Sequence, residues 1–243
     1  MRRPLFGFIL LATLLAPSAA GLAEDWPTLR RLNYAALLGN AGKELRLQAR
    51  SVQHARLYGE ELSYILYGHD GNEIASGGTP LNTSATIAAT PKTDGLCALE
   101  LDSGWNICFF DSGETPSAYV ASETVPLQTI REIERLYFYV PKDCKRFSIG
   151  VSASVTGEGA RIVVFAPDGQ TVKEQEGDFD KREQIKVDVP AGADGKAWSL
   201  SVAKPGAPKL YVDDVELSLD PALPPYLSKR AEWAVLFGQR KHQ

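Results

Sequence analysis

The sequence predicts an all-β protein made of two tandem antiparallel β-sandwich (jelly-roll-like) domains that follow a signal peptide. The clearest stretch is 136–169, which contains three strand patterns in succession. Leu136, Phe138 and Val140 alternate with other residues, and the four residues from Ile162 form an unbroken apolar run. Period-2 alternation is typical of strands buried on one face, and an unbroken apolar run is typical of a central strand.

The second observation is an internal repeat with an offset of about one hundred residues. Strand and turn residues of the first half recur in the same order in the second half. Self-similarity at one nearly fixed offset indicates duplication of a structural unit, and two copies indicate a tandem pair rather than a solenoid. The matching positions are Lys43 and Lys145, Leu45 and Phe147, Leu47 and Ile149, Asp70 and Asp168, Ile87 and Ile185, Pro91 and Pro190, and Gly95 and Gly195.

The strands expected within each copy are short and separated by turn signals roughly every 8–12 residues, as in a β-sandwich. No amphipathic helical segment lies between them, which disfavours a parallel α/β fold. The expected strands cover residues 34–38, 45–49, 62–67, 85–89, 96–101, 105–110 and 118–121 in the first copy, and 136–140, 147–155, 162–165, 185–189, 197–202 and 210–219 in the second.

The expected boundaries divide the chain into five parts. A positive start at Arg2 and Arg3, a short apolar run over 5–15 and small residues near position 20 are typical of a secretory signal peptide. The tail has apolar residues at helical spacing and is expected to form a helix on the sandwich or to fray. The parts are 1–23 (signal peptide), 24–121 (first domain), 122–134 (linker), 135–227 (second domain) and 228–243 (tail).

Two of the three cysteines are predicted to form a disulfide. Residues 96–101 and 105–110 read as a hairpin around Asp102-Ser103-Gly104, which places Cys97 opposite Cys108. Opposed residues in a hairpin have Cβ atoms roughly 4.5–5.5 Å apart, so a disulfide is feasible and would persist after export. The alternative is a pair of small core residues. Cys144 is left as a turn thiol.

Charge and hydropathy limit the location and the partners. The formal net charge is −4, with a pI near 5.5, and no cluster of Lys and Arg suits nucleic acid. No segment after the signal peptide is long and apolar enough to span a membrane. The mature protein is therefore expected to be exported, to the periplasm or the cell exterior.

Catalytic chemistry is not recognisable in the sequence. The three histidines lack metal-ligand spacing, and no serine lies in a G-x-S-x-G motif. Carboxylate pairs such as Asp213-Asp214 and Glu60-Glu61 are interpreted as solvated strand edges or loops. We therefore expect neither an enzyme nor a bound metal or cofactor.

Four aromatic residues are candidates for ligand binding: Trp105, Tyr137, Tyr139 and Tyr211. Each lies at a predicted turn or on the less apolar face of a predicted strand, where a ring can stack on a sugar. The alternative is that these rings fill the core or the interface between the two sandwiches.

Four segments carry a resemblance to a known class: RLYFYVPKDCKRFSIGV, APDGQTV, VPAGADGKAWSLSV and YVDDVELSLDPALPPYL. The chain resembles the tandem galactose-binding-like or pre-peptidase C-terminal-like β-sandwich modules of secreted bacterial proteins, most strongly over 136–227. The resemblance implies a non-catalytic accessory role, although no catalytic domain is attached here, and it supplies no fixed binding residues. Two hypotheses follow: an exported binding module for carbohydrate, or a structural protein that docks an exported partner.

Overall fold

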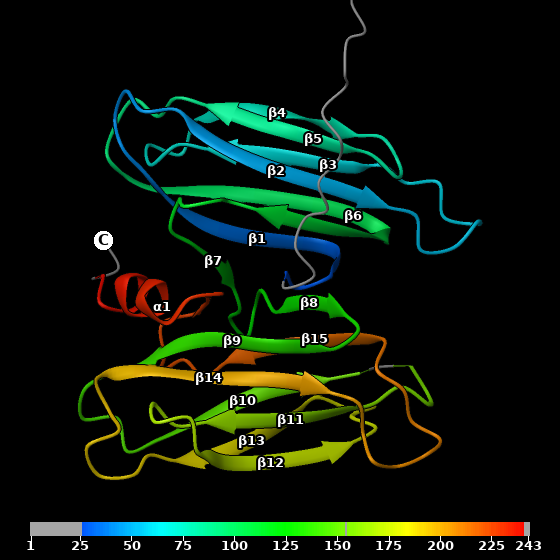
Figure 1. Ribbon diagram of the computed structural model, residues 1–243, viewed down its shortest axis with the longest axis vertical. Coiled ribbons are helices and arrows are strands. Elements are labelled where there is room, and N and C mark those ends of the chain that lie inside the picture. The colour runs from blue at the N-terminus through cyan, green and yellow to red at the C-terminus, as the bar shows by residue number, and fades with distance from the viewer. Residues whose placement is uncertain (1–25, 154, 241–243) are drawn as a thin grey trace, which may run out of the picture.

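The computed structural model describes residues 26–153 and 155–240, so the predicted signal peptide lies outside the described residues. The described part forms sixteen strands and one helix, and all strand pairings are antiparallel (Figure 1), which confirms the all-β prediction. The elements are β1 (Leu29–Gly39), β2 (Leu45–Val52), β3 (Leu62–Tyr67), β4 (Glu73–Thr79), β5 (Ser84–Ala89), β6 (Gly95–Asp111), β7 (Ser117–Val120), β8 (Leu127–Ile130), β9 (Ile133–Val140), β10 (Arg146–Ser152), β11 (Ala160–Phe165), β12 (Thr171–Gly177), β13 (Glu183–Asp188), β14 (Lys196–Ala203), β15 (Asp214–Leu219), β16 (Tyr226–Leu227) and α1 (Ala231–Gly238).

One sheet runs through both halves of the chain. Its main path is β13-β10-β15-β8-β1-β6-β2-β5, and a second, four-stranded sheet has the order β12-β11-β14-β9. This order is symmetric about the neighbouring strands β8 and β1. From β1 toward one edge of the sheet the order is β1, β6, β2 and β5, and from β8 toward the other edge it is β8, β15, β10 and β13. At the centre, Leu29 of β1 pairs with Thr129 of β8. The two halves are thus continuous through one shared sheet.

The strand registers and turns repeat with the same offset as the sequence. Leu45 pairs with Ala89 in the first half as Phe147 pairs with Val187 in the second half. The carboxylate of Asp94 accepts the N–H of Ala41 at 2.7 Å, and that of Asp194 accepts the N–H of Asp143 at 2.8 Å. Both halves also bend at an arginine with positive φ, Arg31 (62°) and Arg131 (73°). The internal repeat found in the sequence therefore has a structural counterpart.

The segment expected to be a linker, 122–134, instead contributes to the sheet. Residues 127–130 form β8, which pairs with β15 on one side and with β1 on the other. The Asn33 side chain ties β8 to β1: its amide donates to the carbonyl of Gln128 at 3.1 Å, and its oxygen accepts the Gln128 N–H at 2.8 Å. The junction between the halves is therefore hydrogen-bonded structure rather than a tether.

The predicted hairpin between Cys97 and Cys108 is wrong. The segment forms one long strand, β6, which pairs with β1 along both of its parts, with β3 along its first part and with β2 along its second part. Gly104, with φ of 53°, allows a bend, and its N–H donates to the Asp102 carboxylate at 2.9 Å. Cys97 faces Leu37 rather than Cys108, and both cysteines are free thiols. The turn residues had signalled a change of pairing partners, not a hairpin.

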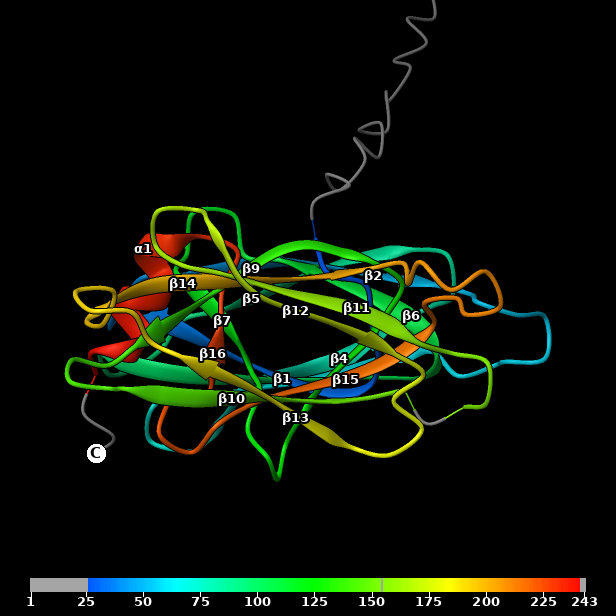
Figure 2. The same cartoon turned by 90° about the horizontal axis from the view of Figure 1, so that it is seen from below.

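The core of each half is centred on an aromatic trio. In the second half, Phe147 of β10 makes edge contacts with Phe138 of β9 at 5.5 Å and with Trp198 of β14 at 5.3 Å between ring centroids. These contacts span two layers, with β9, β14 and β11 above β10, β13 and β15 in Figure 2. In the first half, Phe110 contacts Trp26 and Tyr119 in the same manner.

The tail is helical, as predicted, and packs over the junction. α1 buries Trp233, Ala234 and Phe237, and the cluster that these rings join includes Ala36 of β1 and Ala118 of β7. Burial of one such aromatic side chain contributes about 1.5–3 kcal/mol, which is enough to hold a two-turn helix in place.

We predict three free thiols in the folded protein, of which only Cys144 reacts readily. Burial raises the pKa of all three thiols, that of Cys108 to about 12, but Cys97 and Cys108 are buried whereas Cys144 is partly exposed. Because an alkylating reagent must reach the thiol, alkylation of the native protein followed by mass spectrometry should label Cys144 alone, and all three after unfolding. A reducing agent should leave the melting temperature unchanged. Recovery of a single thiol after unfolding would contradict this assignment.

Candidate functional site

The structure places the four sequence-predicted aromatic residues in three different settings. Trp105 and Tyr211 are 45% and 50% exposed, in segments that meet at the junction of the two halves. Tyr137 lines a cleft of about 720 Å³. Tyr139 is 8% exposed and lies beneath α1, where Gly238 packs so closely against it that a Cβ would not fit. Tyr139 is therefore a packing residue and is removed from the ligand-binding candidates.

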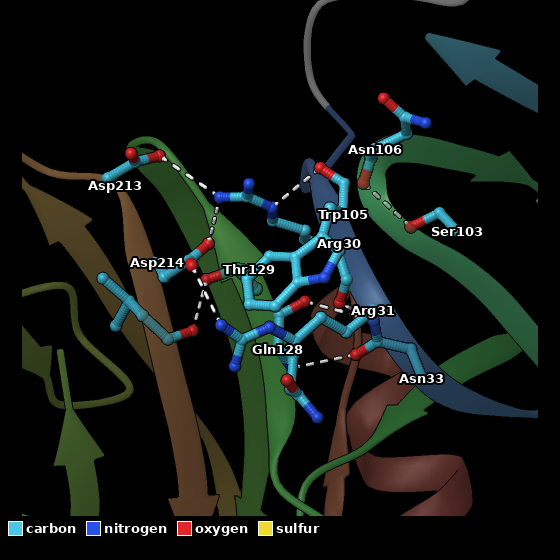
Figure 3. A network of polar contacts seen from close by, with 11 residues as sticks. Arg30, Arg31, Asn33, Ser103, Trp105, Asn106, Gln128, Thr129, Asp213 and Asp214 are labelled. Carbon is cyan, nitrogen blue, oxygen red and sulfur yellow. Dashed lines mark hydrogen bonds and ion pairs between the residues drawn. The ribbon is translucent and has the colours of Figure 1, made fainter. Parts of the chain in front are cut away.

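The junction is held by Arg30, which follows Leu29 at the point where β1 bends. Its side chain is buried, its Nη1 donates to Asp214 Oδ1 at 2.7 Å, and its Nε donates to the backbone oxygen of Trp105 at 3.0 Å (Figure 3). A buried guanidinium needs such partners, because the loss of its hydration is costly. Arg30 thereby joins the start of β15 to the bend of β6. The prediction that Asp213-Asp214 is simply solvated is corrected for Asp214.

Trp105 is part of a stack of side chains that runs from Arg31 to His54. The guanidinium of Arg31 lies 4.5 Å from the Trp105 ring centroid, and Tyr58 stacks on Trp105 at 6.2 Å, followed by His54 at 6.3 Å from Tyr58. The buried side-chain amide of Asn106 fixes the loop that carries Tyr58 and His54. Its nitrogen donates to the Glu60 carbonyl, and its oxygen accepts the backbone N–H of His54. The Trp105 ring is therefore fixed by neighbours rather than mobile.

Tyr211 lies in the loop between β14 and β15. Its backbone carbonyl accepts the Gly159 N–H at 2.9 Å, which joins this loop to the loop before β11. Glu158, in that second loop, is 4% exposed, and its Oε2 has no hydrogen-bond partner. Trp105 and Tyr211 thus belong to segments that the Arg30–Asp214 pair connects, with Glu158 buried behind Tyr211.

The carboxyl group of Glu158 is held partly protonated at neutral pH. Burial is the largest cause of its pKa of about 7, against an ordinary 4.5, and the negative charges of Asp213 and Asp214 raise it further. The Asp214 backbone N–H and the Arg30 charge act in the opposite direction. A buried acid beside two carboxylates favours its neutral form.

Glu158→Gln is predicted to remove a pH dependence of stability. Since the pKa is higher in the folded than in the unfolded chain, the free energy of unfolding falls as pH rises from about 4.5 to about 7. The full loss above this range is about 3 kcal/mol, at roughly 1.4 kcal/mol per pKa unit.

Urea unfolding at about pH 5 and about pH 8 measures this difference. The Glu158→Gln protein should show little change between the two, and the exposed Glu132→Gln control should behave as the wild type does. An identical pH slope in wild type and Glu158→Gln would refute the assignment.

The second feature is a cleft of about 720 Å³ at the junction, on the side where α1 packs. No aliphatic side chain lines it. Two of its rings are covered by cations: Lys229 Nζ lies 3.7 Å from the Trp26 ring centroid, and the Arg230 guanidinium lies 4.5 Å from that of Trp233. The lining residues are Trp26, Asp111, Gly113, Glu114, Glu134, Arg135, Tyr137, Lys229, Arg230 and Trp233.

The floor of the cleft is fixed by hydrogen bonds across the junction. The Tyr137 N–H donates to the Ser228 carbonyl at 2.7 Å, and the Ser228 N–H donates back at 2.8 Å. Arg230 binds both carboxylate oxygens of Glu114 at 2.9 Å, which ties the segment before α1 to the turn after β6. Tyr137 is half-buried and presents part of its ring to the cleft.

Sequence reasoning found Tyr137 but missed most of this lining. Trp26 and Trp233 lie in segments that read as lead-in and tail, where no periodic pattern marks them as part of a site. Arg30 and Glu158 carry no signal in one sequence, because a lone Arg or Glu is usually solvated. The burial of Arg30 follows from the contact between the halves, and that of Glu158 from the pairing of its loop with the loop that carries Tyr211, which is remote in sequence.

Within residues 26–153 and 155–240, no group of three or more His, Cys, Asp or Glu side chains is placed to hold a metal ion. The helix in this part of the chain is not long and apolar enough to cross a membrane. No protein-family model matches the chain, and no curated protein is significantly similar to it in sequence.

Proposed function

We propose that this protein is an exported, non-catalytic binding module whose ligand is a carbohydrate held in the cleft beside Tyr137. The observation that carries the proposal is the composition of the cleft lining, which combines three aromatic rings with six charged side chains and no aliphatic one. The cleft volume, about 720 Å³, lies in the range of small-molecule binding sites.

The chemistry of the lining favours sugars over apolar ligands. Carboxylates accept hydrogen bonds from hydroxyl groups, and guanidinium and ammonium groups donate to them. The half-buried ring of Tyr137 provides a flat apolar face for the C–H groups of a sugar, whereas Lys229 and Arg230 cover the rings of Trp26 and Trp233. An apolar ligand would instead remove water from the charged groups of the lining without offering them hydrogen bonds, at considerable cost. The resemblance to secreted accessory sandwich modules supports the same class.

The test is tryptophan fluorescence of the mature protein during titration with a panel of soluble polysaccharides. Trp26 and Trp233 line the cleft, so a bound ligand should change their emission. Tyr137→Ala should raise the dissociation constant about tenfold, the equivalent of losing one ring-stacking contact. Tyr211→Ala, an exposed tyrosine outside the cleft, is the matched control and should bind normally. A folded wild type that gives no saturable signal with any glycan would refute carbohydrate binding.

A second candidate function, docking of an exported protein partner, is favoured by exposed apolar residues near the junction. Leu57, which is 93% exposed, and Val155 lie in the loops that flank Trp105 and Tyr211. In Figures 1 and 2 the β2–β3, β10–β11 and β14–β15 loops project on the same side of the molecule. Exposed apolar side chains gathered on one side are typical of interaction surfaces.

If this surface docks a partner, a Leu57→Ser/Trp105→Ser double variant should lose it. Chemical cross-linking in the exported fraction, with Tyr137→Ala as the control, separates the two functions. A partner retained by the double variant and lost by Tyr137→Ala would place docking in the cleft instead, and this second function would then be wrong.

A further inference from the structure

A second hollow of about 400 Å³ adjoins the cleft. Both are lined by Gly113 and Glu114, which belong to the turn between β6 and β7, so the two hollows lie on either side of this turn. The second hollow is also lined by Asn40 and Lys43 of the turn between β1 and β2 and by Arg46 of β2, and all three residues are exposed. Leu38, Leu45 and Pro116 add apolar lining, and no aromatic residue lines this hollow.

The ridge between the two hollows is the turn that carries Gly113 and Glu114, and hydrogen bonds hold it in place. Gly113 has a φ of 57°, and a Cβ added at this glycine would meet no other atom within 4 Å. Its N–H donates to the Asp111 carboxylate at 2.7 Å, and the Thr115 N–H donates to the Ser112 carbonyl at 3.0 Å. Glu114 is drawn to Arg230 on the cleft side. Gly113 itself therefore places no side chain between the two hollows.

We propose that the cleft and the second hollow form one groove that binds a linear polysaccharide along its length, across Gly113. This inference rests on the proposed function and specifies its ligand class as a chain rather than a terminal sugar. A single sugar unit would occupy one hollow, whereas a chain of several units would contact residues of both hollows. The groups on the far side, Lys43, Arg46 and Asn40, are hydrogen-bond donors suited to sugar hydroxyl and ring oxygens.

The test is the chain-length dependence of affinity. Isothermal titration calorimetry would use oligosaccharides of about two to eight units, prepared from whichever polysaccharide gives the fluorescence signal. Affinity of the wild type should rise with length until both hollows are filled, and then stay constant. Lys43→Ala should weaken the longest ligand about tenfold, as expected for a charge-assisted hydrogen bond, and leave the shortest unchanged.

The internal repeat offers a matched control. Lys145 occupies the position of Lys43 in the second half and is exposed outside both hollows, so Lys145→Ala should bind all ligands normally. A second variant, Gly113→Asn, keeps the positive φ accessible and raises the ridge. It should weaken long ligands while sparing short ones.

The outcomes separate the two levels of the proposal. If short and long ligands bind equally, or if Lys43→Ala and Lys145→Ala behave alike, the cleft binds sugar but the groove is wrong. If no ligand of any length binds to folded wild type, both the proposed function and the groove are wrong. Length-dependent affinity that Lys43→Ala and Gly113→Asn reduce supports both.

Discussion

The pairing of β1 with β8 is the constraint on which the remaining structure depends. Only Leu29 and Thr129 form this pairing, so its backbone hydrogen bonds alone contribute little stability. Side chains reinforce it on the same stretch: Asn33 satisfies both backbone groups of Gln128, and the buried Arg30 binds Asp214. Removal of one partner from such a buried pair would leave an uncompensated charge, which makes the junction selective for one geometry.

This junction also explains why both candidate sites lie between the halves. Trp26 precedes β1 and Tyr137 follows the bend after β8, so the same pairing that joins the strands sets the distance across the cleft. α1 then covers the junction with Trp233, and the small side chains of Ala36 and Ala118 make room for it. The cleft is thus a property of the assembled pair and belongs to neither half alone.

The sequence predicted what local patterns encode. Alternation of apolar and polar residues located most strands, because this pattern involves residues that are close in sequence. The offset of about one hundred residues located the repeat, because matching positions carry similar residue types. β8 was missed because Leu127–Ile130 is short and follows Pro126, as a loop does. β6 was misread because Gly104 permits a bend between pairing partners as readily as a turn. Glu158 was missed because its loop is paired with the loop that carries Tyr211, which lies far away in the sequence.

Tyr137 and Tyr139 show where such reasoning stops. They share one strand, one parity and one residue type, and no pattern separates them; α1 covers Tyr139 and leaves Tyr137 beside the cleft. The same logic distinguishes Lys43 from Lys145, which are equivalent in the repeat. Only Lys43 lies beside the turn after β6 and the hollow next to it. The two halves are similar, and the contact between them, together with the helix that follows the second half, makes their matching residues chemically different.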